Sequence, residues 1–195
     1  MGRLIVAAVV SLTMSGCAVV AAVGGTAVEG LAYLLGGAEE SFSISMRTTL
    51  VAVQKGLKKA DLAVSVLEPV ENGYLITFGN ENLDGKVSLK KQTKSLVTVS
   101  VKVSSGGIRE DSVEQALVDA IRKKSETVNR FERFDFGRYR NIREMPKISA
   151  KKVGWYLPGT FLDVHSLKDS KWLRIKMPSG KMAYLKGSIA AFTRK

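Results

Sequence analysis

The chain has 195 residues, of which 45% are hydrophobic and 25% are charged, a composition typical of folded proteins. A single cysteine and a single histidine exclude an internal disulfide and a Cys/His zinc site, so we expect no metal ion and no other cofactor. The net charge of +12 is uneven: residues 17–129 carry 13 basic and 13 acidic side chains, whereas residues 130–195 carry 16 and 5. This break predicts two units with different partners.

The first segment has the pattern of an export signal, with a positive start, an apolar run over residues 4–13 and small residues before Cys17. It resembles the lipobox of bacterial lipoproteins, although Met14 stands where Leu is usual. The resemblance implies a signal peptide over residues 1–16, cleavage before Cys17 and acylation of its thiol, which anchors the protein in a membrane. Ala18 stands where Asp favours inner-membrane retention, so the resemblance implies the outer membrane, facing the periplasm.

An uncleaved transmembrane helix over residues 4–23 is the alternative, because about 20 apolar residues suffice to span a bilayer. Residues 17–37 are rich in Ala, Val and Gly, and we interpret them as a tether between the lipid and the first folded unit. Glu29 would be costly at the centre of a bilayer, which favours the tether.

Residues 38–128 predict an α+β module. Apolar residues at helical spacing indicate a helix near residues 46–60, and alternation indicates four strands near residues 62–66, 74–78, 87–89 and 97–103. Ser112 and Gln115 form the pattern of a capping box at the start of a second helix. We expect an antiparallel sheet with helices on one face.

The order and composition of residues 17–128 resemble a family of short bacterial lipoproteins catalogued only as a domain of unknown function. In that family a lipobox and an Ala/Gly-rich segment precede the same helix, strands and helix. The carboxylates of the module lie in predicted turns or at element ends, where solvated charge is expected. No phosphate-binding loop, nucleophile elbow or metal-ligand pair occurs in the sequence, so we predict that the protein is not an enzyme.

Residues 138–195 have short segments and frequent turn signals, which indicate a small β-barrel. They resemble the bacterial SH3 family through Arg140–Arg143, Pro158–Thr160, Trp172–Leu173 and Gly180–Leu185. The resemblance implies an SH3-like barrel after a linker over residues 129–137. Aromatic residues in that linker favour, as an alternative, a segment that docks the two modules together.

Members of the bacterial SH3 family commonly bind peptidoglycan or serve as docking modules. The basic and aromatic residues of the second module suit the carboxylates and sugars of peptidoglycan, or the phosphates of anionic lipid. For Trp172 and Tyr184, a place in the barrel core remains open. We expect a peptidoglycan-binding lipoprotein, or alternatively a non-catalytic docking subunit of an envelope complex; the export signal argues against nucleic acid. The candidate ligand-binding residues are Arg140, Arg143, Trp155, Trp172, Arg174 and Tyr184.

Overall fold

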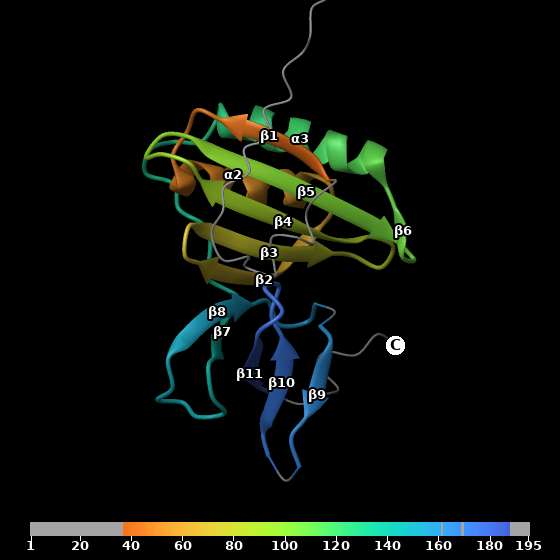
Figure 1. Cartoon of the computed structure of the whole chain (residues 1–195), viewed down its shortest axis with the longest axis vertical. Coiled ribbons are helices and arrows are strands. Elements are labelled where there is room, and N and C mark those ends of the chain that lie inside the picture. The colour runs from red at the N-terminus through yellow and green to blue at the C-terminus, as the bar shows by residue number, and fades with distance from the viewer. Residues whose placement is uncertain (1–36, 161, 169, 188–195) are drawn as a thin grey trace, which may run out of the picture.

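The computed structural model describes residues 37–160, 162–168 and 170–187 (Figure 1). The predictions on the signal peptide, Cys17 and the tether up to residue 36 lie outside these residues. The described elements, in chain order, are β1 (Ala38–Phe42), α2 (Met46–Lys59), β2 (Ala63–Val70), β3 (Gly73–Gly79), β4 (Asp84–Lys91), β5 (Val97–Ser105), β6 (Ile108–Arg109), α3 (Asp111–Ser125), β7 (Arg140–Arg143), β8 (Lys152–Tyr156), β9 (Val164–Ser166), β10 (Trp172–Lys176) and β11 (Met182–Lys186).

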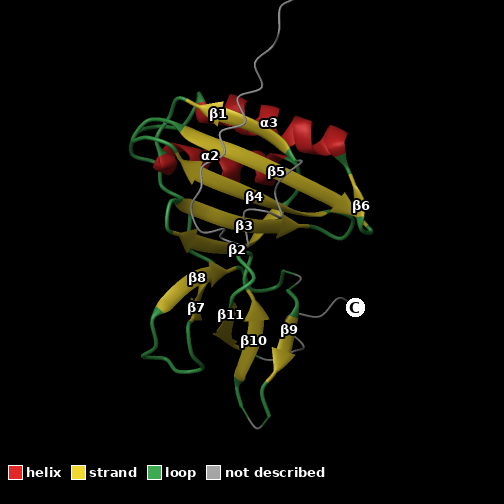
Figure 2. Cartoon of the chain, in the orientation of Figure 1, coloured by secondary structure: helices red, strands yellow, loops and turns green. Residues whose placement is uncertain are grey.

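Both helices pack on one face of the first half of the molecule. Helix α2 begins after Ser45, whose hydroxyl accepts a hydrogen bond of 3.2 Å from the amide of Thr48. Its apolar stripe, with Leu57 fully buried, faces the core that β2–β5 and α3 share. Figure 2 shows both helices beside β1–β5 and none beside β7–β11. Within the described residues, neither helix combines the length and the apolar character needed to cross a bilayer.

The predicted capping box of α3 does not form. The helix begins at Asp111, so Ser112 already lies inside the first turn. Glu110 holds the N-cap position, and its side chain makes no capping hydrogen bond. Two acidic residues in the first turn and three basic residues in the last turn, Arg122 to Lys124, instead complement the helix dipole. One of the acidic residues, Glu114, turns inward and is completely buried.

The four predicted strands of the first half are β2–β5, which pair in sequence order as an antiparallel meander. Strand β1, which was not predicted, covers the outer edge of β5 and pairs Glu39 with Ser100. The two-residue β6 was not predicted either. The side chains of Val97, Val99 and Val101 alternate onto the helix-covered face, where they are completely buried.

The prediction of a separate SH3-like barrel is wrong. The described strands form one open, eleven-stranded antiparallel sheet in the order β1-β5-β4-β3-β2-β8-β7-β11-β10-β9, with β6 beside β5. The second half continues the first because β8 pairs with β2, with Val66 opposite Tyr156 and Leu67 opposite Trp155. Frequent turn signals predicted short β-segments in this half, but such signals carry no information on whether the strands close on one another or extend another sheet.

Two features let β8 lie against β2. Gly154 is one: a Cβ atom there would come within 2.9 Å of the Leu67 carbonyl oxygen, so the close approach requires glycine. The other is alternation in β8, which sends Tyr156 to a second core with Val66, Ile142 and Leu185, and Trp155 to the edge of the first core. Each half therefore keeps its own core within one sheet.

The segment between α3 and β7 is packed against α2. Arg47 donates to the Glu132 carbonyl oxygen at 2.6 Å, and Lys55 forms an ion pair of 2.7 Å with the Glu132 carboxylate. The side-chain amide of Gln54 exchanges hydrogen bonds of 3.0 and 2.9 Å with the backbone of Asp135. These contacts hold residues 129–135 in one place and position the start of β7.

Candidate functional site

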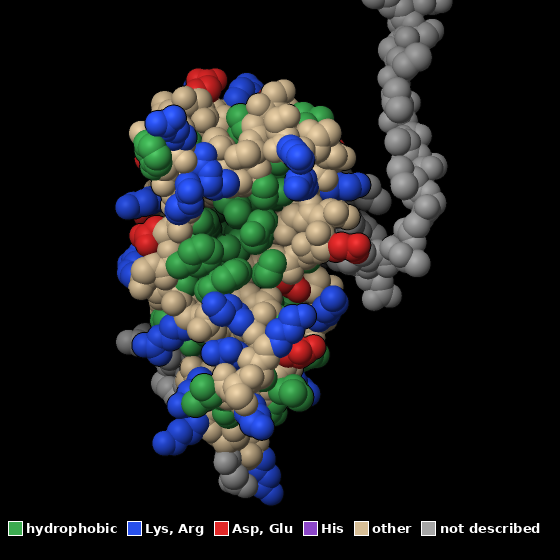
Figure 3. Space-filling view, turned by 90° about the vertical axis from the view of Figure 1, so that its left-hand side faces the viewer, with side chains coloured by type: hydrophobic (Ala, Val, Ile, Leu, Met, Phe, Trp, Pro, Cys, Tyr) green, Lys and Arg blue, Asp and Glu red, His purple; other side chains and the backbone are tan. Residues whose placement is uncertain are grey.

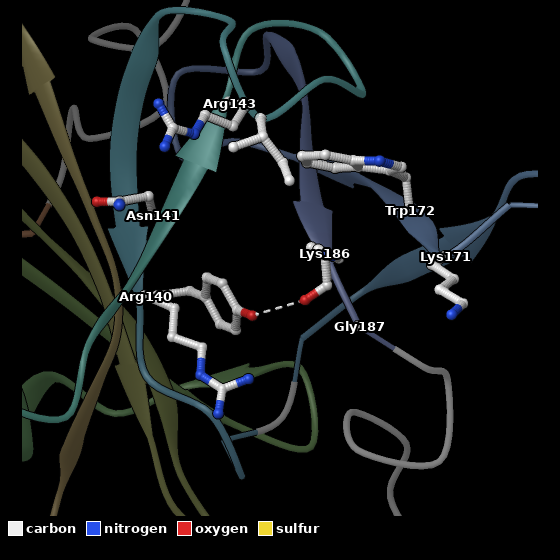
Figure 4. A pocket seen from close by; sticks show the side chains of 9 residues that line it. Arg140, Asn141, Arg143, Lys171, Trp172, Lys186 and Gly187 are labelled. Atoms are coloured by element: carbon white, nitrogen blue, oxygen red, sulfur yellow. Dashed lines mark hydrogen bonds between the residues drawn. The ribbon is translucent and has the colours of Figure 1, made fainter.

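A cavity of about 780 Å³ lies in the second half of the sheet, between the β7–β8 hairpin and the adjoining ends of β10 and β11 (Figure 4). Four of its lining residues are cationic and two are aromatic. The described residues that line it include no carboxylate, thiol or imidazole, and its cations and rings suit the binding of anions and flat rings. These residues are Arg140, Asn141, Arg143, Ile148, Tyr156, Lys171, Trp172, Lys186 and Gly187.

Tyr156 forms the rigid inner wall of the cavity. Its side chain is 1% exposed, and its hydroxyl donates a hydrogen bond of 3.1 Å to the Lys186 carbonyl oxygen, the dashed line in Figure 4. Burial raises the pKa of Tyr156, and the neighbouring Arg140 guanidinium offsets part of that rise. The phenol is therefore neutral at physiological pH and ties β8 to the end of β11.

Trp172 forms the opposite wall. It is the first residue of β10, and its amide donates a hydrogen bond of 3.1 Å to the hydroxyl of Ser170. Trp172 lies directly across from Lys186 in the β10–β11 pair, and paired residues of an antiparallel sheet project to the same face. Its half-buried ring lies flat along the cavity, with Arg140 on the other side of the space (Figure 4).

The four cations of the cavity, Arg140, Arg143, Lys171 and Lys186, have no carboxylate partner within the described part of the chain. Arg143 donates to the Ala150 carbonyl oxygen at 2.9 Å, which fixes its guanidinium beside the hairpin. Cations gathered around one hollow raise the local concentration of anions.

Two further predicted residues, Tyr184 and Arg174, lie next to the cavity along the same face of the sheet. Tyr184 lies opposite Arg143 on one side and opposite Arg174 on the other, and Arg174 in turn lies opposite His165. These four side chains therefore form a row on one face of β7, β11, β10 and β9. Tyr184 is half-buried and Arg174 is exposed, so neither belongs to the core of the second half.

Trp155 lies apart from the other candidate residues. As the neighbour of Tyr156 in β8 it points to the opposite face of the sheet, and its ring centroid lies 4.8 Å from that of Phe136. The ammonium group of Lys152 lies 5.2 Å from the Trp155 ring centroid. Trp155 therefore packs between the first core and the α3–β7 segment.

Lys171 and Lys186 were not among the predicted site residues. Lys171 directly precedes Trp172, so its position beside a candidate aromatic residue could have identified it as a site residue. Lys186 reaches the cavity only through the register of β10 and β11, which the sequence does not reveal. Within the described residues no group of His, Asp or Glu side chains could hold a metal ion, and His165 is exposed beside Asp163 at 3.7 Å.

Comparison with known proteins finds a family match for the first half of the chain. A family model described as "Protein of unknown function (DUF3568)" matches residues 1–124, which confirms the resemblance to an uncharacterised domain. No curated protein matches the chain. The match ends inside α3, so the cavity and strands β7–β11 lie outside it. Because the matched residues make up more than half of the sequence, the chain belongs to this family of unknown function.

Proposed function

We propose that this protein is an envelope lipoprotein, anchored through an acylated Cys17, whose cationic cavity binds peptidoglycan or another anionic component of the envelope. The observation that carries the proposal is the convergence of four cations and two aromatic rings around one hollow whose described lining has no carboxylate. The lipobox-like pattern before Cys17 supports the anchor, and Ala18 supports the outer membrane facing the periplasm.

The chemistry of the cavity suits this class of ligand. Stem peptides of peptidoglycan carry carboxylates, which a guanidinium such as that of Arg140 binds with two parallel hydrogen bonds. The flat indole of Trp172 offers its face to an amino-sugar ring or a peptide backbone. The row from Arg143 to Arg174 continues the positive surface along the sheet, so a polymer can lie across it in more than one register.

Co-sedimentation of the full chain with peptidoglycan sacculi over a salt series tests the cavity. Changing Lys171→Gln together with Lys186→Gln should weaken binding about tenfold, because two charge-assisted contacts are lost. Trp172→Ala should weaken binding in a way that salt does not reproduce, since stacking is not screened. The matched control, Lys58→Gln with Lys59→Gln in the last turn of α2, removes the same charge away from the cavity.

Equal losses in the cavity variant and the control variant would mean that only net charge matters, and the cavity would be rejected as the binding site. If the unaltered chain shows no saturable binding to sacculi, peptidoglycan binding is rejected, and the alternative function, a docking subunit of an envelope complex, is favoured.

The anchor has a separate test. Cells that express the chain are labelled with a radioactive fatty acid, and incorporation into the protein is compared with that into Cys17→Ser. Labelling lost in the variant supports acylation at Cys17, whereas an unlabelled wild-type chain contradicts it.

A further inference from the structure

Exposed apolar side chains gather in one short stretch of the chain. Six large apolar residues are exposed in the described part of the molecule, and four of them fall within residues 131–148. Phe131 is 71% exposed and Phe136 is 38% exposed, both in the segment between α3 and β7. That segment descends the left-hand side of Figure 1, and Figure 3 shows apolar side chains gathered on the same side. Apolar patches of this kind mark interaction surfaces.

Basic side chains accompany these aromatic residues. Arg130, Arg133 and Arg138 are exposed in the same segment, and the guanidinium of Arg130 lies 4.7 Å from the ring centroid of Phe131. Figure 3 shows Lys and Arg side chains above and below the apolar area, and fewer Asp or Glu. Of the three acidic residues in the segment, Glu126 and Asp135 are exposed and Glu132 forms an ion pair with Lys55. The surface is therefore apolar at its centre and positive at its rim.

The exposure of Phe131 is imposed by the fold. The backbone on either side of it is held by Arg47, which donates to the carbonyl oxygens of Asn129 at 3.3 Å and Glu132 at 2.6 Å. Phe134, three residues further on, is buried in the first core, and its ring lies tilted against Phe136 with centroids 4.7 Å apart. The contacts on both flanks thus fix the backbone that presents Phe131 to solvent.

We propose that this aromatic face, defined by Phe131, Phe136, Arg130, Arg133 and Arg138, rests on an anionic phospholipid surface. Aromatic rings enter the boundary between headgroups and acyl chains, while guanidinium groups remain at the phosphates, so a lipid surface satisfies both parts of the patch. A partner protein would instead have to supply an apolar pocket rimmed by carboxylates. The proposal requires neither the cavity nor an acyl group.

The length of the chain is compatible with this placement. Gly37 follows Cys17 by 20 residues, a stretch that can span at most about 70 Å. An acylated chain could therefore bring the aromatic face to the bilayer that holds its own anchor, which would leave the cavity of the second half available to the cell wall.

The test is sedimentation with lipid vesicles of the full chain carrying Cys17→Ser, so that no acyl chain contributes. Vesicles of phosphatidylcholine alone are compared with vesicles that also contain phosphatidylglycerol. We expect several-fold tighter binding to the anionic vesicles. Phe131→Ser should weaken that binding about fivefold, and Arg130→Gln with Arg133→Gln about tenfold.

Two matched controls accompany these variants. Ile108→Ser alters a side chain of the same exposure, 73%, on β6 at the opposite side of Figure 1. Lys176→Gln with Lys181→Gln removes two exposed charges at the turn between β10 and β11, outside the aromatic face. Both controls should bind like the parent chain.

Equal weakening by Ile108→Ser and Phe131→Ser, or equal binding to neutral and anionic vesicles, would overturn the proposal. Sacculi contain no phospholipid, so failure here is distinguishable from failure of the cavity to bind peptidoglycan.

Discussion

Glu68 joins the two halves of the sheet, and its removal should lower the stability of the whole molecule. The carboxylate is 5% exposed and accepts hydrogen bonds of 2.8 Å from the Ser179 amide and 2.6 Å from its hydroxyl, across 111 residues of sequence. A hydrogen bond to a charged group contributes about 1.5–3 kcal/mol. Because Ser179 is half-buried and water can replace part of what is lost, Glu68→Ala should lower the free energy of unfolding by about 3 kcal/mol.

Urea unfolding with two probes measures this effect. Far-UV circular dichroism reports mainly α2 and α3 in the first half, whereas fluorescence reports Trp172 in the second half together with Trp155, whose ring packs at the edge of the first core. The two transitions should coincide in the unaltered chain, since one sheet unfolds as one unit. Both should move to lower urea in Glu68→Ala.

The matched control is Glu71→Ala, which removes an exposed carboxylate from the β2–β3 turn and should change the free energy of unfolding by less than about 0.5 kcal/mol. A loss below about 1 kcal/mol in Glu68→Ala would refute the reasoning about the bridge. Separate transitions in the unaltered chain would refute the coupling of the two halves.

Two further predictions concern the first half. The buried Glu114 carboxylate accepts hydrogen bonds from the amides of Val103 at 3.0 Å and Ala38 at 3.2 Å and from the Arg109 guanidinium at 2.8 Å. Glu114→Ala should therefore lower the free energy of unfolding, measured in urea, by about 3–5 kcal/mol. A change near zero would contradict this role of Glu114. Burial raises the pKa of Tyr139 to about 12, above its unfolded value near 10. The stabilisation is complete below about pH 10 and is lost as the pH rises towards 12, so melting temperatures should fall more steeply over that range in the wild type than in Tyr139→Phe. Parallel curves would contradict the assignment.

Local signals along the chain were enough to predict several of the elements. Helical spacing from Met46 onward predicted α2, and two-residue alternation predicted β2–β5, because periodicity follows directly from backbone geometry. The excess of Lys and Arg after residue 129 likewise predicted a positive surface in the second half. The residue patterns before Cys17 and within residues 38–128 led to a resemblance to an uncharacterised family, and the family match confirmed that much.

Which strands pair with one another depends on packing between distant parts of the chain. The pairing of β8 with β2, which makes one open sheet out of two expected modules, depends on Gly154, on Glu68 and on two apolar faces distant in sequence. The same holds for the candidate site: Arg140 and Lys186 line one cavity because of the pairing and register of β7, β8, β10 and β11. Alternation predicts which residues of a strand share a face, but many pairs of strands are compatible with the same alternation. Which strands pair is set by packing between residues far apart in the sequence.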